Sequence, residues 1–308
     1  MRIGTAHSYQ STIDNLQRRQ QSLADAQARL SSGKRVATPS DDPAAAARAE
    51  RALAATSRAE AAQRALQASR NVMQQAESAL GDAGEQLQQA RELIVAAGNG
   101  SYSDADRAGI ADQLRGLRTR LLAIANRDDG AGNRLFGGQG ASAQPFVDAP
   151  GGVRFDGLPG QMLVIAGEPL PISVDGRSTW LAAPNAVTGA DDLSVFDLLG
   201  RIADELATPG RDGATIGAAV RDGLRDVDAS MDRLSSQRAR LGESLGRVDN
   251  VEARLAQVVL AGQTERSNAE DLDMVQAVSE FQSQQTGYDA ALKTYSMVQR
   301  MSLLDHLR

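Results

Sequence analysis

The distribution of proline constrains this chain more than any other feature of its sequence. Seven of the nine prolines lie from Pro145 to Pro209, whereas residues 44–144 and 210–308 contain none. Proline inside a helix removes a hydrogen bond and clashes with the preceding turn, so only proline-free stretches form long, regular helices. We therefore expect two long helical regions on either side of a central, non-helical insertion.

The composition favours long helices over a compact enzyme core, because only 3% of the 308 residues are aromatic and none is cysteine. The missing thiols exclude disulfides and thiolate metal sites. A net charge of −6 argues against binding to nucleic acid or to acidic membranes. No segment approaches the roughly 20 apolar residues that span a membrane, and the N-terminal residues lack a signal-peptide core. We expect no nucleic-acid partner, no membrane insertion and, if the protein is exported, no cleaved signal peptide.

The stretch LSSGKRVATPSDDPAAAAR, residues 30–48, contains a helix stop followed by a helix start. Gly33 can adopt the left-handed conformation that ends a helix. Asp42 can cap the next helix, and Pro43 fits its first turn, where a backbone N–H is not needed. We interpret Gly33, Asp42 and Pro43 as a joint between two domains.

The helix before this joint carries an apolar seam, meaning apolar residues spaced three or four apart on one face. Its members are Ile13, Leu16, Leu23 and Leu30, with Gln20 and Gln27 between them. The glutamines have two interpretations: either the assigned helix face is slightly wrong, or the helix folds firmly only with partners.

The second region should contain long, packed helices. From about Pro43 to Ala97, large and small residues alternate along one stripe: Leu66, Ser69, Met73, Ala76, Leu80, Ala83, Leu87, Ala90, Ile94 and Ala97. A capping box at Ser103 and Asp106 should start a third helix, antiparallel to the second, with Ile110, Leu114, Leu117, Leu121 and Ile124 facing inward. A long helix from about Gly213 should bury Leu224, Val227, Met231, Leu234, Arg238, Leu241, Leu245, Val248, Glu252, Leu255 and Val259.

The chain should end in another amphipathic helix, after a break at QTERSN (263–268) with Asn268 as its cap. Its seam is Met274, Val278, Phe281, Tyr288, Leu292 and Tyr295, continued after a shift by Val298, Met301 and Leu304. Residues 1–40 carry a net charge of +4, from six basic and two acidic residues, and residues 268–308 carry −3, from three basic and six acidic residues. Because both seams and charges are complementary, we expect the two ends to pair.

The insertion has short β-prone runs separated by Gly, Pro and Asp. We predict a mainly α fold: a long antiparallel bundle or coiled coil formed by the N- and C-terminal regions, with a small β-rich inserted domain. The predicted domains are a terminal coiled-coil assembly domain (1–40 and 268–308), a helical rod (41–137 and 191–267, with a short helix near 194–206) and the β-rich outer insert (138–190).

No catalytic, cofactor-binding or metal site is predicted. The paired aspartates at 41–42, 128–129 and 191–192 lie at expected helix ends or turns, where capping explains them better than metal binding. The glycine-rich GGQGAS at 137–142 lacks the strand and the GK[ST] of a phosphate loop. His7 and His306, the only histidines, do not form a catalytic set with Ser and Asp.

Two linked motifs resemble the signatures of the flagellin superfamily: LSSGKRVATPSDDPAAAAR at 30–48, and NAEDLDMVQAVSEFQSQQTGYDAALKTYSMVQRMSLLDHL at 268–307. The resemblance covers about three quarters of the chain. The opening MRIGTAHSYQ, the PSDDP at 39–43 and NRLFGGQGASAQPF at 133–146 are more similar to the junction proteins of that superfamily than to filament flagellins. The LFGG within this last segment departs from the expected pattern.

The resemblance implies a structural, non-enzymatic subunit of the bacterial flagellum, exported to the cell exterior by the type III route and guarded before export by a cytoplasmic flagellar export chaperone. It would form a homo-oligomeric ring between hook-associated protein 1 and the flagellin filament, through its terminal helices. A flagellin, the bulk filament subunit, is the alternative. We also weighed two other classes, a helical enzyme with its site in the insert and a cytoplasmic coiled-coil chaperone.

Overall fold

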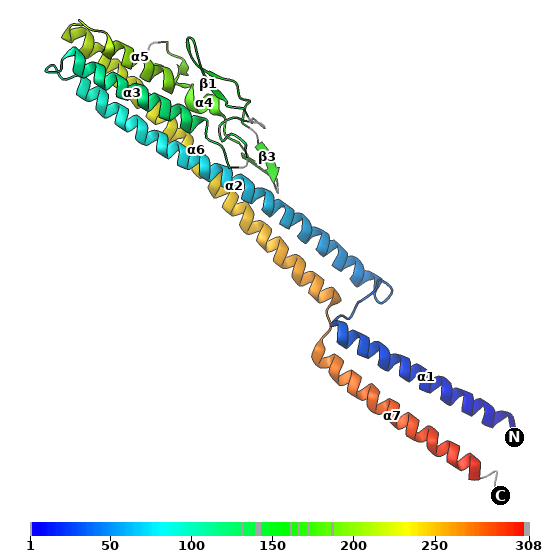
Figure 1. The fold of residues 1–308 in the computed structure, drawn as a ribbon. Coiled ribbons are helices and arrows are strands. Elements are labelled where there is room, and N and C mark those ends of the chain that lie inside the picture. Colours follow the sequence, from blue (N-terminus) through cyan, green and yellow to red (C-terminus); the bar gives the residue numbers. More distant parts are fainter. Residues whose placement is uncertain are drawn as a thin grey trace. The chain divides into compact units, whose positions relative to one another are not determined.

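The computed structural model describes residues 2–304 except 131, 139–142, 161, 166, 172, 186 and 187, and it describes side chains from Gln10 to Met297 within them. The chain forms two compact units (Figure 1). The terminal unit comprises Met1–Ala59 and Ala256–Arg308, and the central unit comprises Glu60–Leu255. Two long helices contribute to both units.

The described part of the chain is mainly helical, as predicted. Its helices are α1 (Arg2–Ser32), α2 (Pro43–Ala97), α3 (Asp104–Ala125), α4 (Gly176–Trp180), α5 (Val195–Ala207), α6 (Gly213–Glu270) and α7 (Met274–Leu304). Its strands are β1 (Phe146–Ala149), β2 (Gly152–Phe155), β3 (Met162–Ile165), β4 (Glu168–Pro171), β5 (Ala183–Pro184) and β6 (Asp191–Leu193). The terminal helices α1 and α7 pack against each other, and the strands form only small sheets.

The local signals for helix ends are confirmed. Gly33 has a φ of 68°, in the left-handed region, immediately after α1. The carboxylate of Asp42 accepts hydrogen bonds from the N–H groups of Ala44 at 3.1 Å and Ala45 at 3.0 Å, which caps α2. Ser103 and Asp106 form the expected capping box at the start of α3.

In the central unit, α2, α3, α5 and α6 run side by side (Figure 1). All ten residues predicted for the α2 stripe are buried, and so are the five predicted for α3. Ion pairs connect Arg91 to Asp228 and Glu77 to Arg238, which shows that α2 and α6 are antiparallel. The core of this unit therefore consists of interlocking helices, as the alternation of large and small residues predicted.

The predicted seam of α6 is only half right. Val227, Leu234, Leu241, Val248 and Leu255 are buried, but Arg238 is exposed and Leu224, Met231, Leu245, Glu252 and Val259 are half-buried. At Met231, Arg238, Leu245 and Glu252 the buried residue is instead the one immediately before the predicted one. These buried residues are Ser230, Gln237, Ser244 and Val251. Arg238 and Glu252 lie at the edge of the core instead, where they pair with Glu77 and Arg70 of α2.

The described residues of the insertion form three two-stranded antiparallel sheets, β1–β2, β3–β4 and β5–β6. It shares a core with the helices, because Phe146 and Trp180 pack against Phe196 of α5, with ring centroids 5.7 and 5.8 Å from it. The Ser69 hydroxyl of α2 also donates a 2.6 Å hydrogen bond to the carbonyl of Pro171. These contacts tie the insertion to the helical framework of the central unit.

The predicted break at QTERSN is wrong. Helix α6 continues through this segment to Glu270, and α7 begins at Met274. The cap of α7 is Asp273, not Asn268: its carboxylate accepts hydrogen bonds from the N–H groups of Val275 and Gln276. The segment contains neither Gly nor Pro, so its polar residues form an exposed helix surface instead of a stop.

Candidate assembly surface

Helices α1 and α7 of the terminal unit lie side by side in opposite directions (Figure 1). The guanidinium of Arg19 lies 3.0 Å from the position that a Cβ on Gly287 would occupy. Farther along the pair, Ser22, Asp25 and Arg29 share a cavity of about 230 Å³ with Ala277, Glu280 and Gln284. Small and polar residues of α7 therefore lie against α1 at these two places along the pair.

The predicted seam residues are only partly covered in this pair. Ile13, Leu16, Leu23 and Leu30 of α1 and Phe281, Tyr288 and Tyr295 of α7 are half-buried. Met274, Val278 and Leu292 are 48%, 41% and 40% exposed. Val298, Met301 and Leu304 lie in α7, but their side chains are outside the described ones.

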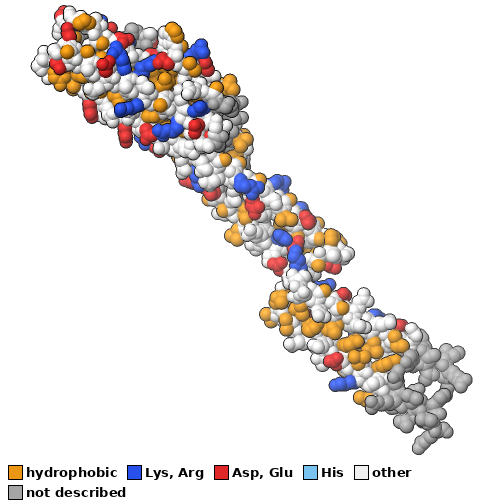
Figure 2. All heavy atoms as spheres, in the orientation of Figure 1, with side chains coloured by type: hydrophobic (Ala, Val, Ile, Leu, Met, Phe, Trp, Pro, Cys, Tyr) orange, Lys and Arg blue, Asp and Glu red, His pale blue; other side chains and the backbone are white. Residues whose placement is uncertain are grey.

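The apolar seam of α7 is therefore divided: α7 packs against α1 with Phe281, Tyr288 and Tyr295 partly covered, whereas other members of the seam stay exposed. Met274, Val278 and Leu292 lie on one side of α7, beside the face that contacts α1, and we call them the open flank. Figure 2 shows apolar side chains gathered on the visible surface of this helix pair. Exposed apolar surfaces of this kind are typical of protein–protein interaction sites.

The segments that connect α1 to α2 and α6 to α7 are bound to each other, and we call this contact the clasp. The N–H of Arg35 donates to the carbonyl of Glu270 at 2.7 Å, and the N–H of Leu272 donates to the carbonyl of Gly33 at 2.9 Å. Lys34 and Asp271 form an antiparallel β-bridge. The segment predicted as a joint, from Gly33 to Pro43, is thus bonded to a C-terminal segment that the sequence did not indicate.

Side chains reinforce the clasp. Lys34 forms a 2.9 Å salt bridge with Glu270, which joins the basic and acidic ends of the chain. Arg35 donates a 2.8 Å hydrogen bond to the carbonyl of Ala269. The hydrogen bond from Lys34, with a smaller effect of Arg266, holds the pKa of Glu270 below its ordinary value. Glu270 therefore remains a carboxylate over a wider pH range than a free glutamate would.

A small apolar cluster closes the clasp underneath. Val36, which is 5% exposed, packs with Ala45 and Ala49 of α2 and with Ala269 of α6. The backbone N–H groups of Thr38 and Ala37 bind the Asp41 carboxylate and lower its pKa. Val36, a large aliphatic residue within the otherwise small and polar linker GKRVATPSDD, is the signal that could have revealed this cluster.

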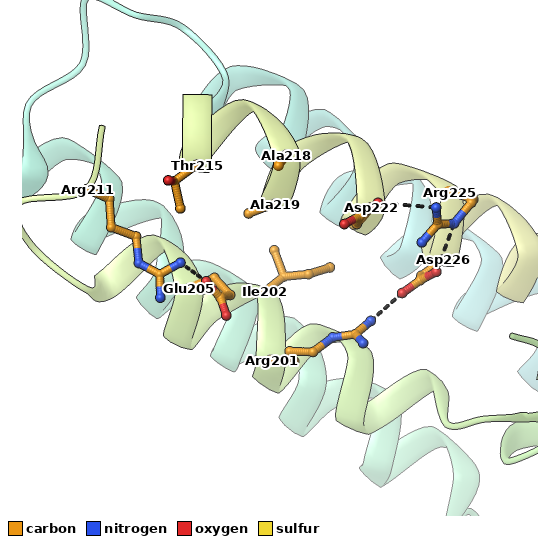
Figure 3. Close-up of a pocket in the computed structure, with 11 residues that line it drawn as sticks. Arg201, Ile202, Glu205, Arg211, Thr215, Ala218, Ala219, Asp222, Arg225 and Asp226 are labelled. Atoms are coloured by element: carbon orange, nitrogen blue, oxygen red, sulfur yellow. Dashed lines mark hydrogen bonds and ion pairs between the residues drawn. The ribbon is translucent and has the colours of Figure 1, made fainter. Parts of the chain in front are cut away.

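A cavity of about 270 Å³ between α5 and α6 in the central unit is the other candidate site (Figure 3). Ile202, Ala218 and Ala219 line it, and its charged groups pair with one another: Arg201 with Asp226, and Arg211 with Glu205. Asp226 is also within 3.6 Å of Arg225. Because these charges satisfy one another, the network holds α5 on α6 and leaves no polar group aimed at a ligand.

Among the described residues, no group of three or more His, Asp or Glu side chains could hold a metal ion. The side chains of His7 and His306 lie outside the described ones. Within the described part of the chain, none of the helices combines the length and apolar character needed to cross a bilayer.

Comparison with known proteins identifies the family to which this chain belongs. Residues 3–141 match the bacterial flagellin N-terminal helical region, and residues 224–307 match the bacterial flagellin C-terminal helical region. Flagellar hook-associated protein 3 of Salmonella typhimurium is 30% identical over 313 residues, covering 98% of each chain. The chain belongs to the hook-associated protein 3 family of the flagellin superfamily.

Two further comparisons concern the fold and a flagellin. The flagellar junction protein FlgL of Legionella pneumophila has a similar fold, with a TM-score of 0.61 and 16% identity over 73% of this chain and 100% of that one. A flagellin of Bacillus subtilis is 27% identical, but the match covers only 63% of this chain and 62% of that one. Membership of the hook-associated protein 3 family makes this a structural helical protein of the bacterial flagellum.

Proposed function

We propose that this protein forms a homo-oligomeric ring that joins hook-associated protein 1 to the flagellin filament. It would act as a structural subunit and not as an enzyme, without a cofactor. The observation that carries this proposal is the open flank of α7, which α1 leaves uncovered at Met274, Val278 and Leu292. In a ring, neighbouring subunits would cover this flank on every copy.

The predicted seam residues on both terminal helices would take part in these contacts. Burying a leucine-sized side chain stabilises a contact by about 1.5–3 kcal/mol. No described side chain of α1 or α7 is buried within one chain, so most of this free energy is still available for contacts between subunits. The clasp at Gly33, Asp42 and Pro43 would join the assembling helices to the rod.

Assembly outside the cell requires export, and we propose that the chain is secreted to the hook-filament junction without a cleaved signal peptide. An amphipathic α7 with an open flank would aggregate before export, which gives a cytoplasmic flagellar export chaperone a surface to cover.

The alternative function is that of a flagellin, the bulk subunit of the filament. Similarity over the whole length of a hook-associated protein 3, including the insertion, favours the junction role. The two roles differ in copy number and position: a junction protein occupies one narrow band, whereas a flagellin extends along the filament.

The deciding experiment is to label this protein on sheared flagella and to delete its gene. We expect one labelled band where hook and filament meet, and a deletion strain that sheds flagellin into the medium. Label along the whole filament would support the flagellin alternative. Normal filaments in the deletion strain would contradict both roles.

A further inference from the structure

The turn that joins α2 to α3 contains the only Asn–Gly pair of the sequence, Asn99–Gly100. Residues 99–101 are all exposed, at the end of this helix hairpin (Figure 1). Asparagine is a chemically labile side chain, because the backbone nitrogen of the following residue can attack its amide carbon and close a five-membered ring. Glycine has no Cβ to crowd that nitrogen, so this pair is the most reactive of its kind in the chain.

The Asn99 side chain is folded back over its own backbone. Its Oδ1 accepts hydrogen bonds from the N–H of Ser101 at 3.1 Å and from the Ser101 hydroxyl at 2.9 Å. The bond to the backbone N–H spans the peptide unit of Gly100, so it keeps the Asn99 amide group beside the Gly100 nitrogen. Holding two reacting groups together in this way favours reaction between them.

The hydrogen bonds of the turn are distributed as this reaction requires. Negative charge develops on Oδ1 when a nitrogen adds to the amide carbon, and the two Ser101 donors stabilise that charge. Within the part of the chain that the structure describes, neither the Gly100 N–H nor the Asn99 Nδ2 has a hydrogen-bond partner. The attacking and the departing nitrogen are therefore both unrestrained.

We infer that Asn99 is a site of spontaneous deamidation. The Gly100 nitrogen gives its proton to a base in the solvent and forms a bond to Cγ of Asn99. The Cγ–Nδ2 bond breaks, and Nδ2 takes up a proton and leaves as ammonia. Water then opens the succinimide ring: cleavage of the new N–Cγ bond gives aspartate, and cleavage at the main-chain carbonyl gives isoaspartate. One water is consumed, one ammonia is released, and no atom is oxidised or reduced.

The products change the turn in two ways. Both place a new carboxylate just after α2, near Arg107, which is 8% exposed and has its guanidinium 3.5 Å from the Asn99 carbonyl. Isoaspartate also adds one carbon to the backbone, next to the 3.2 Å hydrogen bond from the Tyr102 N–H to the Asn99 carbonyl. Modification thus marks the surface with charge and lengthens the connection between α2 and α3. It is a property of the chain itself and does not rest on the proposed ring.

Tryptic digestion isolates this position. Residues 92–107, between Arg91 and Arg107, form a peptide in which Asn99 is the only side-chain amide. Replacement of its NH₂ by OH raises the mass of this peptide by about 1 Da. We expect the heavier form to accumulate when the purified full chain is kept at mildly alkaline pH, and to separate into aspartate and isoaspartate peptides. A sample digested before incubation corrects for reaction during digestion.

The chain offers two matched controls. Residues 128–134 form a tryptic peptide whose single side-chain amide, the exposed Asn133, is followed by Arg134 instead of glycine, and it should keep its mass. In Gly100→Ala the new Cβ meets no atom within 4 Å, and φ is outside the left-handed region, so alanine fits the folded turn. It crowds the attacking nitrogen, and the reaction should slow by on the order of tenfold.

Comparison of the native chain with the chain unfolded in guanidinium chloride tests the contribution of the fold. The native chain should react at least as fast, because the turn orders the Ser101 donors, and Ser101→Ala should slow the native reaction by about two- to tenfold. An intact Asn99 in the native chain, when the unfolded chain is modified, would overturn the inference. So would equal rates for Asn99 and Asn133, or for wild type and either variant. Absence of the protein from the hook-filament junction would refute the proposed function and leave this inference standing.

Discussion

The α2–α6 pair in the central unit and the α1–α7 pair in the terminal unit bury their apolar side chains to very different extents. In the central unit, α2 buries Leu66, Met73, Leu80, Leu87 and Ile94 to 1% exposure or less. In the terminal unit, no described side chain of α1 or α7 is fully buried. Both pairs have amphipathic sequences, so amphipathicity alone does not show where a helix finds its partner.

The difference in burial follows from the number of helices and strands that pack against each pair. Helices α2 and α6 are covered by α3, α5 and the insertion, whose aromatic core adds further apolar area. The α1–α7 pair has only one contact face, and two helices alone bury too little surface to offset the entropy of ordering them. The central unit should therefore be stable by itself, and the terminal helices should gain most of their stability from other subunits.

The largest effect on monomer stability is expected for Leu80→Ala, because Leu80 is fully buried in the central unit. Removing a buried leucine side chain costs about 2–5 kcal/mol. Urea unfolding followed by the fluorescence of Trp180, the only tryptophan, measures this loss. Val95→Ala on the exposed side of the same helix should change the free energy of unfolding by no more than about 0.5 kcal/mol. Equal losses for both variants would mean that α2 is not packed as described.

A smaller effect is expected for Glu270→Gln in the clasp. The pKa of Glu270 is lowered in the folded protein, so its carboxylate stabilises the clasp above the ordinary value of 4.5, and this contribution disappears as pH falls through the lowered value. We expect a loss of about 0.2–1 kcal/mol at neutral pH. Amide exchange at Arg35 and Leu272, whose N–H groups bond across the clasp, should accelerate accordingly.

The difference between wild type and Glu270→Gln should vanish in acid. Glu265→Gln is the control, because Glu265 lies outside the clasp and pairs with Arg48 at 3.8 Å. It should leave exchange at Arg35 unchanged. If the wild type keeps its advantage at a pH far below 4.5, the Lys34–Glu270 pair is not the cause.

The smallest effect on the monomer, close to zero, is expected for Leu292→Asp. Leu292 is 40% exposed on the open flank, so the variant should be exported and soluble with an unchanged melting temperature. A carboxylate buried at a subunit contact is costly, and the cost recurs at every contact of a ring. Cells should therefore shed flagellin, whereas cells with Ser283→Asp, an exposed residue on a different face of α7, should build normal filaments. Normal filaments with Leu292→Asp would show that this flank faces solvent.

The sequence predicted the buried faces of α2 and α3, and it was less accurate for α6. On α2 the large residues occupy the core positions, so counting apolar side chains found the buried face. On α6 the core accepts Ser230, Gln237 and Ser244, because the opposing helix and its neighbours determine the space available. Met231 and Leu245 looked like better core residues but lie half-buried at the edge.

Prediction of the assembly surface from the sequence was limited for the same reason. The apolar residues of α7 were identified from their spacing, but which of them α1 covers depends on how the two helices are rotated. The clasp was missed because its backbone bonds join residues more than 200 positions apart, and backbone groups leave no trace in side-chain patterns. Asp273 was not predicted as the cap of α7, because the polar segment QTERSN before it was interpreted as the helix break although it is helical.

The clasp also orders the events of folding. Lys34 and Glu270 are separated by 236 residues, and closing so long a loop in an unfolded chain costs entropy that grows with the logarithm of its length. Once α2 and α6 have packed together as far as Thr56 and Gly262, the loop that must close to bring the clasp segments together is short. We therefore expect the clasp to form late in folding and at little entropic cost, after the helices that bring its halves together. Alignment of α1 with α7 then becomes a consequence of completed folding in the rest of the chain, so an incompletely folded subunit presents its two terminal helices unjoined.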